Sequence, residues 1–261
     1  MNKIITNAIA ASIVVAAAGS AGATIYEWDW QVGDPGAYGT KNTGGTFESI
    51  LSTFNTETNA LTWDVTFSDQ ITDGFTLALN NGPNPKGHAG ELALLYVDIT
   101  DIPNPKMLAY AYNGKNSNNS YFDGNGEVAG NQAPDDIVDV EDRGGSGWID
   151  HLTVVDSIDG KRTISFAIDA TVINNKTPDY PGDTPWFGTG FDDKFGIWLH
   201  PYMDLETEYD PGNGLLTKWN GKSGYFDGSG FKTTEVPSPG PVALIAGAGV
   251  LAGSRRRRND K

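Results

Sequence analysis

Oxygen-bearing side chains at alternate positions mark one segment of the chain as a candidate calcium site. Asp123, Asn125 and Glu127 have this spacing, and Asp227 occupies the matching position in a similar Tyr-Phe-Asp-Gly sequence further along the chain. Calcium loops supply carboxylate and amide oxygens at alternate residues. The segment lacks the glycine and the glutamate that an EF-hand requires at its sixth and twelfth positions. The pattern therefore predicts either an irregular calcium site or an Asp-Gly turn that holds no metal.

Carboxylates that could take part in hydrolysis occur in the acidic run at 135–142. If this run is extended, Asp139 and Glu141 share one face of a strand, and two carboxylates about 5–5.5 Å apart suit a retaining glycosidase. With Asp136 included, however, the spacing differs from the Glu-x-Asp-x-Glu pattern of concanavalin-like glycosidases. The chain also has no Gly-x-Ser-x-Gly elbow, no histidine pair at zinc spacing and no cysteine. We interpret the run as a solvated loop and predict no catalytic residue.

Aromatic side chains are the third chemical feature, with seven tryptophans and ten tyrosines in the chain. Their broad apolar faces can stack on sugar rings or fill a core. The alternating stretches around Trp28, Trp30 and Trp63 indicate core positions for these three. Three other tryptophans flank glycine-rich or proline-rich loops and are the better candidates for exposed glycan-binding residues, although core packing is the favoured interpretation of each: Trp148, Trp186 and Trp219.

The elements that position these residues are predicted to be strands. Apolar side chains recur at every second position around 26–30, 61–67, 75–79, 108–112, 164–170 and 195–199, as on half-buried strands. The nearly continuous apolar run at 92–99 indicates a central strand. Thirty-three glycines and fourteen prolines favour many turns. We therefore predict an all-β chain of ten or eleven strands, folded as a single β-sandwich of the jelly-roll or concanavalin-like type.

An internal echo supports this interpretation. The order aromatic residue, Asn-Gly-Lys, short spacer, Tyr-Phe-Asp-Gly occurs once around Asn113-Gly114 and again around Asn220-Gly221. Asn-Gly is a strong signal for a two-residue hairpin turn, because both residues tolerate a positive φ. The echo predicts two equivalent hairpins, with a paired binding site as the alternative.

Charge narrows the range of partners. The chain has 18 basic and 33 acidic residues and a formal net charge of −15. A surface of that sign repels phosphate backbones and anionic lipids and attracts divalent cations. Nucleic acid is therefore excluded as an expected partner, and solubility in a salty environment is the simplest reason for the charge.

The N-terminus has the pattern of a secretory signal. A lysine at position 3 precedes an apolar stretch at 8–18, and Ala21-x-Ala23 fits the small-residue site of signal peptidase. The stretch is about half as long as the roughly 20 apolar residues of a membrane span. We predict a signal helix over 1–23 that signal peptidase removes, with an uncleaved anchor as the alternative.

The C-terminus carries a second composite signal. A proline-marked segment precedes a short apolar stretch at 241–253, and four arginines follow. This stretch predicts a short hydrophobic helix that inserts transiently in the inner membrane, with the arginines on the cytoplasmic side. An ordinary tail anchor that is never cut is the alternative. The residues that define the signal are Val236, Pro237, Ser238, Pro239, Gly240, Arg255, Arg256, Arg257 and Arg258.

This C-terminal pattern resembles the PEP-CTERM sorting signal, although Ser238 stands where that family has glutamate. The resemblance covers 236–261 and implies processing by an exosortase in a bacterium with a Gram-negative envelope. It also implies a final location at the cell surface or in the matrix, in association with exopolysaccharide and biofilm. It says nothing about the activity of the remainder, so the predicted divisions are 1–23, 24–235 and 236–261.

Together these features predict an exported, non-enzymatic surface or matrix protein. Its body is expected to bind extracellular polysaccharide through loop aromatics, or calcium through loop carboxylates; calcium is the one cofactor that the residues suggest. The alternative is a polysaccharide-active glycoside hydrolase or lyase on the same scaffold.

Overall fold

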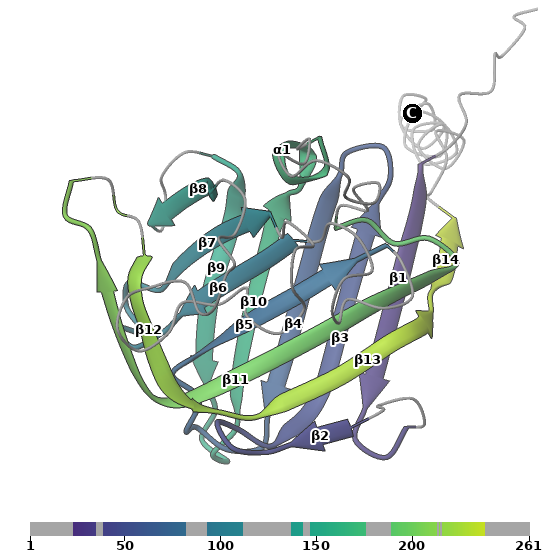
Figure 1. The fold of residues 1–261 in the computed structure, drawn as a ribbon. Helices are drawn as coiled ribbons and strands as arrows, with labels where there is room; N and C mark the ends of the chain where they lie inside the picture. The colour runs from purple at the N-terminus through teal and green to yellow at the C-terminus, as the bar shows by residue number, and fades with distance from the viewer. Residues whose placement is uncertain are drawn as a thin grey trace, which may run out of the picture. The chain divides into compact units, whose positions relative to one another are not determined.

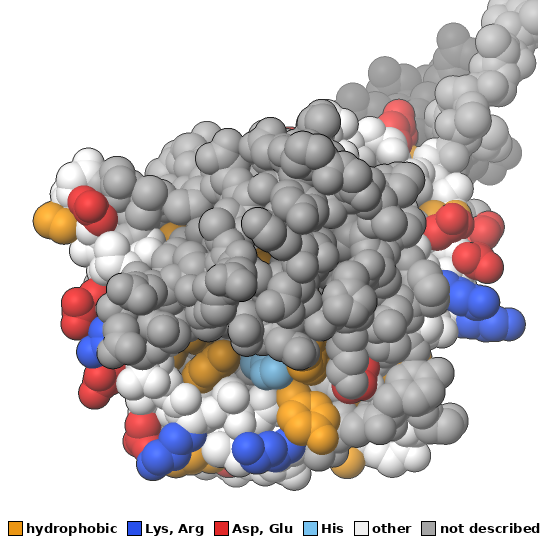
Figure 2. Space-filling view, in the orientation of Figure 1, with side chains coloured by type: hydrophobic (Ala, Val, Ile, Leu, Met, Phe, Trp, Pro, Cys, Tyr) orange, Lys and Arg blue, Asp and Glu red, His pale blue; other side chains and the backbone are white. Residues whose placement is uncertain are grey.

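The computed structural model describes two antiparallel sheets and one short helix, α1 (Thr171–Asn174), so the predicted all-β class is confirmed (Figure 1). Within the described part of the chain no helix has the length and apolar character needed to cross a membrane. The helices predicted at the two termini lie outside the described residues, which are drawn in colour in Figure 1 and are not grey in Figure 2. The described residues are 23–34, 39–81, 93–111, 137–142, 147–175, 189–212, 214 and 216–237.

Sheet A contains six strands in the order β14-β1-β3-β4-β10-β9. All neighbouring strands in it are antiparallel. Its strands are β1 (Thr24–Gln31), β3 (Phe47–Asn55), β4 (Ala60–Phe67), β9 (Ile149–Asp156), β10 (Arg162–Asp169) and β14 (Thr234–Pro237).

Sheet B follows the order β2-β13-β11-β5-β6-β7-β8, and β12 pairs with the far half of β11. Its strands are β2 (Gly39–Lys41), β5 (Gly74–Asn80), β6 (Ala93–Asp98), β7 (Lys106–Ala111), β8 (Ile137–Asp142), β11 (Lys194–Tyr209), β12 (Leu216–Ser223) and β13 (Tyr225–Lys232). The apolar run at 92–99 supplies β6, which lies between β5 and β7 as predicted for a central strand.

Two local predictions were wrong. The acidic run that we interpreted as a loop forms strand β8 from Ile137 to Asp142, because it completes the ladder of β7. Asn220-Gly221 does not turn the chain but lies inside β12, where it passes an irregular stretch of β11. A side chain at Gly221 would come within 3.2 Å of the Leu205 Cα atom, so the glycine serves close approach of two strands.

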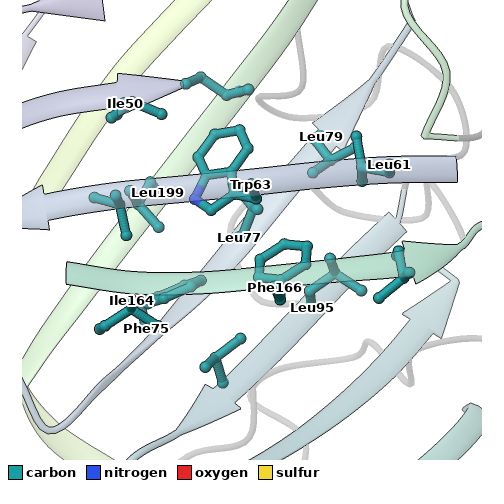
Figure 3. Packing of buried hydrophobic residues seen from close by; sticks show 14 of the residues in the cluster. Ile50, Leu61, Trp63, Phe75, Leu77, Leu79, Leu95, Ile164, Phe166 and Leu199 are labelled. Carbon is teal, nitrogen blue, oxygen red and sulfur yellow. The ribbon is translucent and has the colours of Figure 1, made fainter. Parts of the chain in front are cut away.

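The two sheets bury one apolar face each in a common core. Trp63 on β4 and Phe166 on β10 stack with ring centroids 6.4 Å apart, and side chains of sheet B lie beneath them (Figure 3). Trp28 meets Phe195 of the opposite sheet edge-on at 5.3 Å. The core positions predicted for Trp28, Trp30 and Trp63 are confirmed, with 5%, 5% and 0% exposure.

The outer face of sheet A carries small hydroxyl side chains that bond across strands. The Thr53 and Thr62 hydroxyl oxygens lie 2.6 Å apart, and those of Thr66 and Thr163 lie 3.0 Å apart. Cross-strand pairs of this kind each stabilise a sheet by about 0.2–1 kcal/mol. They satisfy the polar groups of this face within the sheet itself.

A buried arginine joins sheet A to the crossover that leads into sheet B. Arg162 is 7% exposed and donates from Nε and Nη2 to the two carboxylate oxygens of Asp156, at 2.6 and 2.7 Å. Its Nη1 donates to the carbonyl oxygen of Thr72, in the segment between β4 and β5, at 2.6 Å. These hydrogen bonds from Arg162 hold the pKa of Asp156 below its ordinary value.

The Arg162–Asp156 pair predicts a loss of stability in acid. Because the folded-state pKa of Asp156 is lowered, its contribution is present above the unfolded pKa of about 3.9 and is lost as pH falls through the folded value. We expect Asp156→Asn to lower the melting temperature clearly at pH 7. The effect should shrink as the pH falls below the unfolded pKa and through the lowered folded value, because the wild-type carboxylate then loses its charge as well.

Thermal melting across this pH range checks the prediction. Asp150→Asn is the matched control on the same strand, since the Asp150 side chain is 85% exposed. An equal effect of Asp156→Asn at pH 7 and in acid would contradict the proposed linkage.

Candidate functional site

The face of sheet B that points away from the shared core collects aromatic and polar side chains from four strands. Strand alternation puts Phe195, Ile197 and Leu199 of β11 into the core and their neighbours on the other side. We call this side the outer face of sheet B. Its residues include Thr76, Ala78 and Asn80 on β5, Tyr96 and Asp98 on β6, Trp198, His200 and Tyr202 on β11, and Tyr225 and Asp227 on β13.

One half of this face is closed by the hairpin of β11 and β12. The first part of β11 pairs with β5 and β13, and its last part pairs with β12 on both sides of an irregularity at which Asp204 has a φ of 51°. Figure 1 shows the paired ends of β11 and β12 curving away from the rest of sheet B. Trp219 on β12 packs edge-on against Tyr96 and Tyr202, at centroid distances of 5.1 and 5.4 Å. The hairpin therefore covers a second, smaller apolar cluster.

A glycine makes room for the hairpin. A side chain at Gly74 would lie 2.8 Å from the Leu205 Cδ2 atom and 2.5 Å from the Val97 carbonyl oxygen. Burial raises the pKa of the Tyr202 hydroxyl, which keeps Tyr202 neutral in this closed half. The closed half is therefore a packed region and not a ligand site.

A buried carboxylate fastens the hairpin to the sheet. Asp98 is 4% exposed, and its Oδ2 accepts from the Thr207 hydroxyl at 2.7 Å and the Tyr209 hydroxyl at 2.6 Å. Its Oδ1 accepts from the Thr100 backbone and hydroxyl, at 2.9 and 2.7 Å. Lys106, opposite Asp98 on β7, places its Nζ atom 4.2 Å from the centre of the Tyr209 ring. Hydrogen bonds to a charged acceptor are strong, so Asp98 orients the hairpin.

A second set of rings continues the face beside this cluster, and Trp198 packs against the cluster itself. The rings of Trp198 and His200 meet at a centroid distance of 4.5 Å, and Tyr225 lies 6.5 Å from His200. Tyr225 is 36% exposed, and Trp198 and His200 are half-buried. Figure 2 shows a histidine between hydrophobic side chains at the margin of the grey atoms. We call Trp198, His200, Tyr225 and Asp227 the open cluster.

The open cluster combines three rings with one carboxylate. Asp227 on β13 is paired directly with Trp198 across the ladder and is 5% exposed. Because all four residues lie on two hydrogen-bonded strands, their spacing is fixed by the sheet and not by a loop. Rings next to a few fixed polar groups are typical of small-ligand and sugar sites.

The structure describes three of the predicted ligand residues: Trp148, Trp219 and Asp227. Trp148 and Trp219 are 7% and 2% exposed, so the core-packing interpretation is confirmed for both and their candidacy as exposed glycan-binding residues was wrong. Trp148 joins the shared core, and Trp219 packs under the hairpin, because contacts with residues distant in sequence bury them. Asp227 is not in a turn but on strand β13.

The remaining ligand predictions lie outside the described residues: Trp186, Asp123, Asn125 and Glu127. Within the described ranges, no three histidine, aspartate or glutamate side chains come together as metal ligands would. Calcium binding by the 123–127 segment therefore stays a prediction.

Sequence reasoning missed the open cluster, although a signal was present. The apolar alternation at 195–199 was assigned to a core-facing strand, and this assignment was correct. Trp198 and His200 stand at the alternate positions of the same stretch, so they face away from the core on this strand. A large aromatic residue on the outward-facing side of a predicted strand was therefore the signal that could have indicated this cluster.

The predicted processing signals are described only where they meet sheet A. Ala23 precedes the first residue of β1, and Val236 and Pro237 are the last residues of β14. Strand β14 thus extends two residues past the predicted boundary at 235, because it pairs with β1. Ala21, Ser238, Pro239, Gly240 and Arg255, Arg256, Arg257 and Arg258 lie outside the described residues.

Comparison of the chain with protein-family models, with curated proteins and with solved structures finds no match.

Removal of the Asp98 carboxylate is expected to release the hairpin. Asp98→Ala leaves the donors of Thr100, Thr207 and Tyr209 without their acceptor, so we expect a loss of about 2–4 kcal/mol in the free energy of unfolding. Urea denaturation measures this change.

The matched control is Asp101→Ala, in which the lost side chain is exposed and bonds to Asn104 nearby. We expect this control to change the free energy of unfolding by less than about 1 kcal/mol. Similar losses for the two variants would show that Asp98 has no special role.

Proposed function

We propose that the protein is an exported, non-enzymatic surface or matrix protein that binds a glycan at the open cluster. The observation that carries this proposal is the contiguous set of Trp198, His200 and Tyr225 rings beside the Asp227 carboxylate on the outer face of sheet B. The proposal thus moves glycan binding from the loop tryptophans to strand residues.

The chemistry of the open cluster suits a sugar. Ring faces provide apolar area for the C–H face of a pyranose, and Tyr225 is the most exposed ring of the cluster. A strongly acidic chain, with a formal net charge of −15, would disfavour an anionic ligand such as nucleic acid. A neutral or weakly charged polysaccharide is therefore the ligand class that we infer.

The role of the Asp98 carboxylate on this face favours binding over hydrolysis. Asp98 accepts hydrogen bonds from Thr100, Thr207 and Tyr209, and these hold the hairpin in place. Such a carboxylate serves as an anchor and is poorly suited to move protons in catalysis. The glycoside hydrolase or lyase is therefore the weaker alternative.

For the architecture, we propose a concanavalin-like β-sandwich. Sheet A has six strands, and the main path of sheet B has seven, with the long strand β11 between β13 and β5. The core that both sheets share supports a sandwich of two sheets.

For location, we propose export by signal peptidase cleavage after Ala23 and sorting by an exosortase that recognises the PEP-CTERM-like segment. The apolar 241–253 stretch and the arginines after it support a transient stay in the inner membrane. The expected final location is the cell surface or extracellular matrix, near exopolysaccharide.

A polysaccharide array tests the proposed function. The protein is best prepared as residues 24–238, since a fragment that ends at 235 would cut through β14. The array is probed once with calcium and once with a chelator, so that binding seen only with calcium identifies a calcium-dependent site. Absence of binding to every polysaccharide under both conditions would rule the glycan proposal out.

Substitution at the open cluster is expected to weaken this binding selectively. Tyr225→Ala removes a ring that is 36% exposed, so the fold should be kept while affinity falls about 2- to 10-fold. Leu51→Ala, which removes a side chain of similar exposure (38%) from the outer face of sheet A, is the control. Equal affinities of wild type and Tyr225→Ala, measured by titration calorimetry, would place the ligand elsewhere.

A further inference from the structure

The two ends of the body meet in one strand pair. Thr24 is paired with Pro237, Ile25 with Val236, Tyr26 with Glu235 and Glu27 with Thr234. Thr24 follows the predicted signal peptidase site directly, and Val236 begins the predicted sorting segment. Figure 1 shows β1 and β14 side by side at one margin of their sheet. Both processing junctions therefore lie at the same end of the same two strands.

Strand β14 depends on β1 alone within its sheet. It stands at the end of the strand order, and its four residues are paired with the first four residues of β1. The start of β1 is itself fixed to the turn between β3 and β4. The Thr24 carbonyl oxygen accepts from the Thr56 backbone at 3.1 Å, and the Thr24 nitrogen donates to the Thr56 hydroxyl at 3.2 Å.

Pairing in a sheet controls access for a protease. A protease acts on a segment that has left its hydrogen-bonded partners, so cleavage of a paired strand tracks the population of its opened form. While β14 is paired, the peptide bonds between Thr234 and Pro237 are protected. Pro237, the last residue of the strand, also provides no backbone N–H to continue the ladder.

We infer that the β1–β14 pair sets the limit of C-terminal processing: the tail is removed from a folded body, at a bond beyond Pro237. The inference rests on the proposed removal of the tail, and it adds the state of the substrate and the position of the cut. The retained chain then keeps all of β14, with its new C-terminus beside its new N-terminus at Thr24.

The N-terminal cut, unlike the C-terminal one, requires a chain that has not yet folded. Thr24 is already a strand residue, so no spacer separates the Ala23–Thr24 bond from sheet A. A peptidase that needs residues on both sides of that bond in an extended cleft must act before β1 pairs with β3. The two cuts therefore follow an order, with the signal removed before folding and the tail removed after it.

Intact-mass analysis of the protein recovered from cells tests the position of the cut. We expect a chain that begins at Thr24 and ends at a residue beyond Pro237. A C-terminus at or before Pro237 would overturn the inference and leave tail removal intact. A C-terminus at Lys261 would instead contradict the proposed tail removal, and the protection of β14 is then decided by the next experiment.

Limited digestion of the purified full chain with proteinase K tests the protection without any sorting enzyme. In the wild type, we expect cuts beyond Pro237 to appear before cuts within 234–237. The double variant Glu235→Gly/Val236→Gly weakens β14, and cuts within 234–237 should appear about 5- to 30-fold faster. Early cuts within β14 of the wild type, or an unchanged rate in the double variant, would overturn the inference.

The control variant changes the other margin of the same sheet. Thr153→Gly/Val155→Gly weakens β9, where both side chains are exposed, and should leave the rate of cutting at 234–237 unchanged. If this control accelerated cutting at β14 as much as Glu235→Gly/Val236→Gly does, general loss of stability would explain both results and the inference would fail.

Discussion

The burial of one apolar face by each sheet is the constraint on which the rest of the structure depends. Because side chains alternate along a strand, fixing Trp63 and Phe166 in the shared core also fixes which residues face outward. A shift of one residue in the register of any strand would turn its core side chains outward and its outward side chains into the core. The hydroxyl pairs on the outer face of sheet A and the aromatic residues on the outer face of sheet B both follow from the packing of the shared core.

Strand β11 shows how one element can serve both core and site. Its first half sends Ile197 and Leu199 into the core and Trp198 and His200 to the outer face. Its second half leaves the plane of the sheet with β12 and is held by the buried Asp98. The same strand therefore closes one part of the outer face and supports the open cluster on the other, on rigid backbone.

The margin of sheet A has a different role. Pairing of β14 with β1 joins the beginning and the end of the body and leaves both junctions together. For a protein attached to a membrane through either terminus, this arrangement would keep that end toward the membrane. The open cluster belongs to the other sheet, so the proposed processing and the proposed ligand binding would use separate parts of the fold.

The all-β class, the central position of β6 and the core positions of Trp28, Trp30 and Trp63 could be predicted from the sequence, because period-two alternation is a local property of the chain. Which other aromatic residues are buried depends on contacts that form only in the folded chain. Trp148 and Trp219 stand beside glycine-rich segments, yet residues far away in sequence cover them. Burial and strand pairing at a boundary such as Pro237 depend on such distant partners, which no local pattern contains.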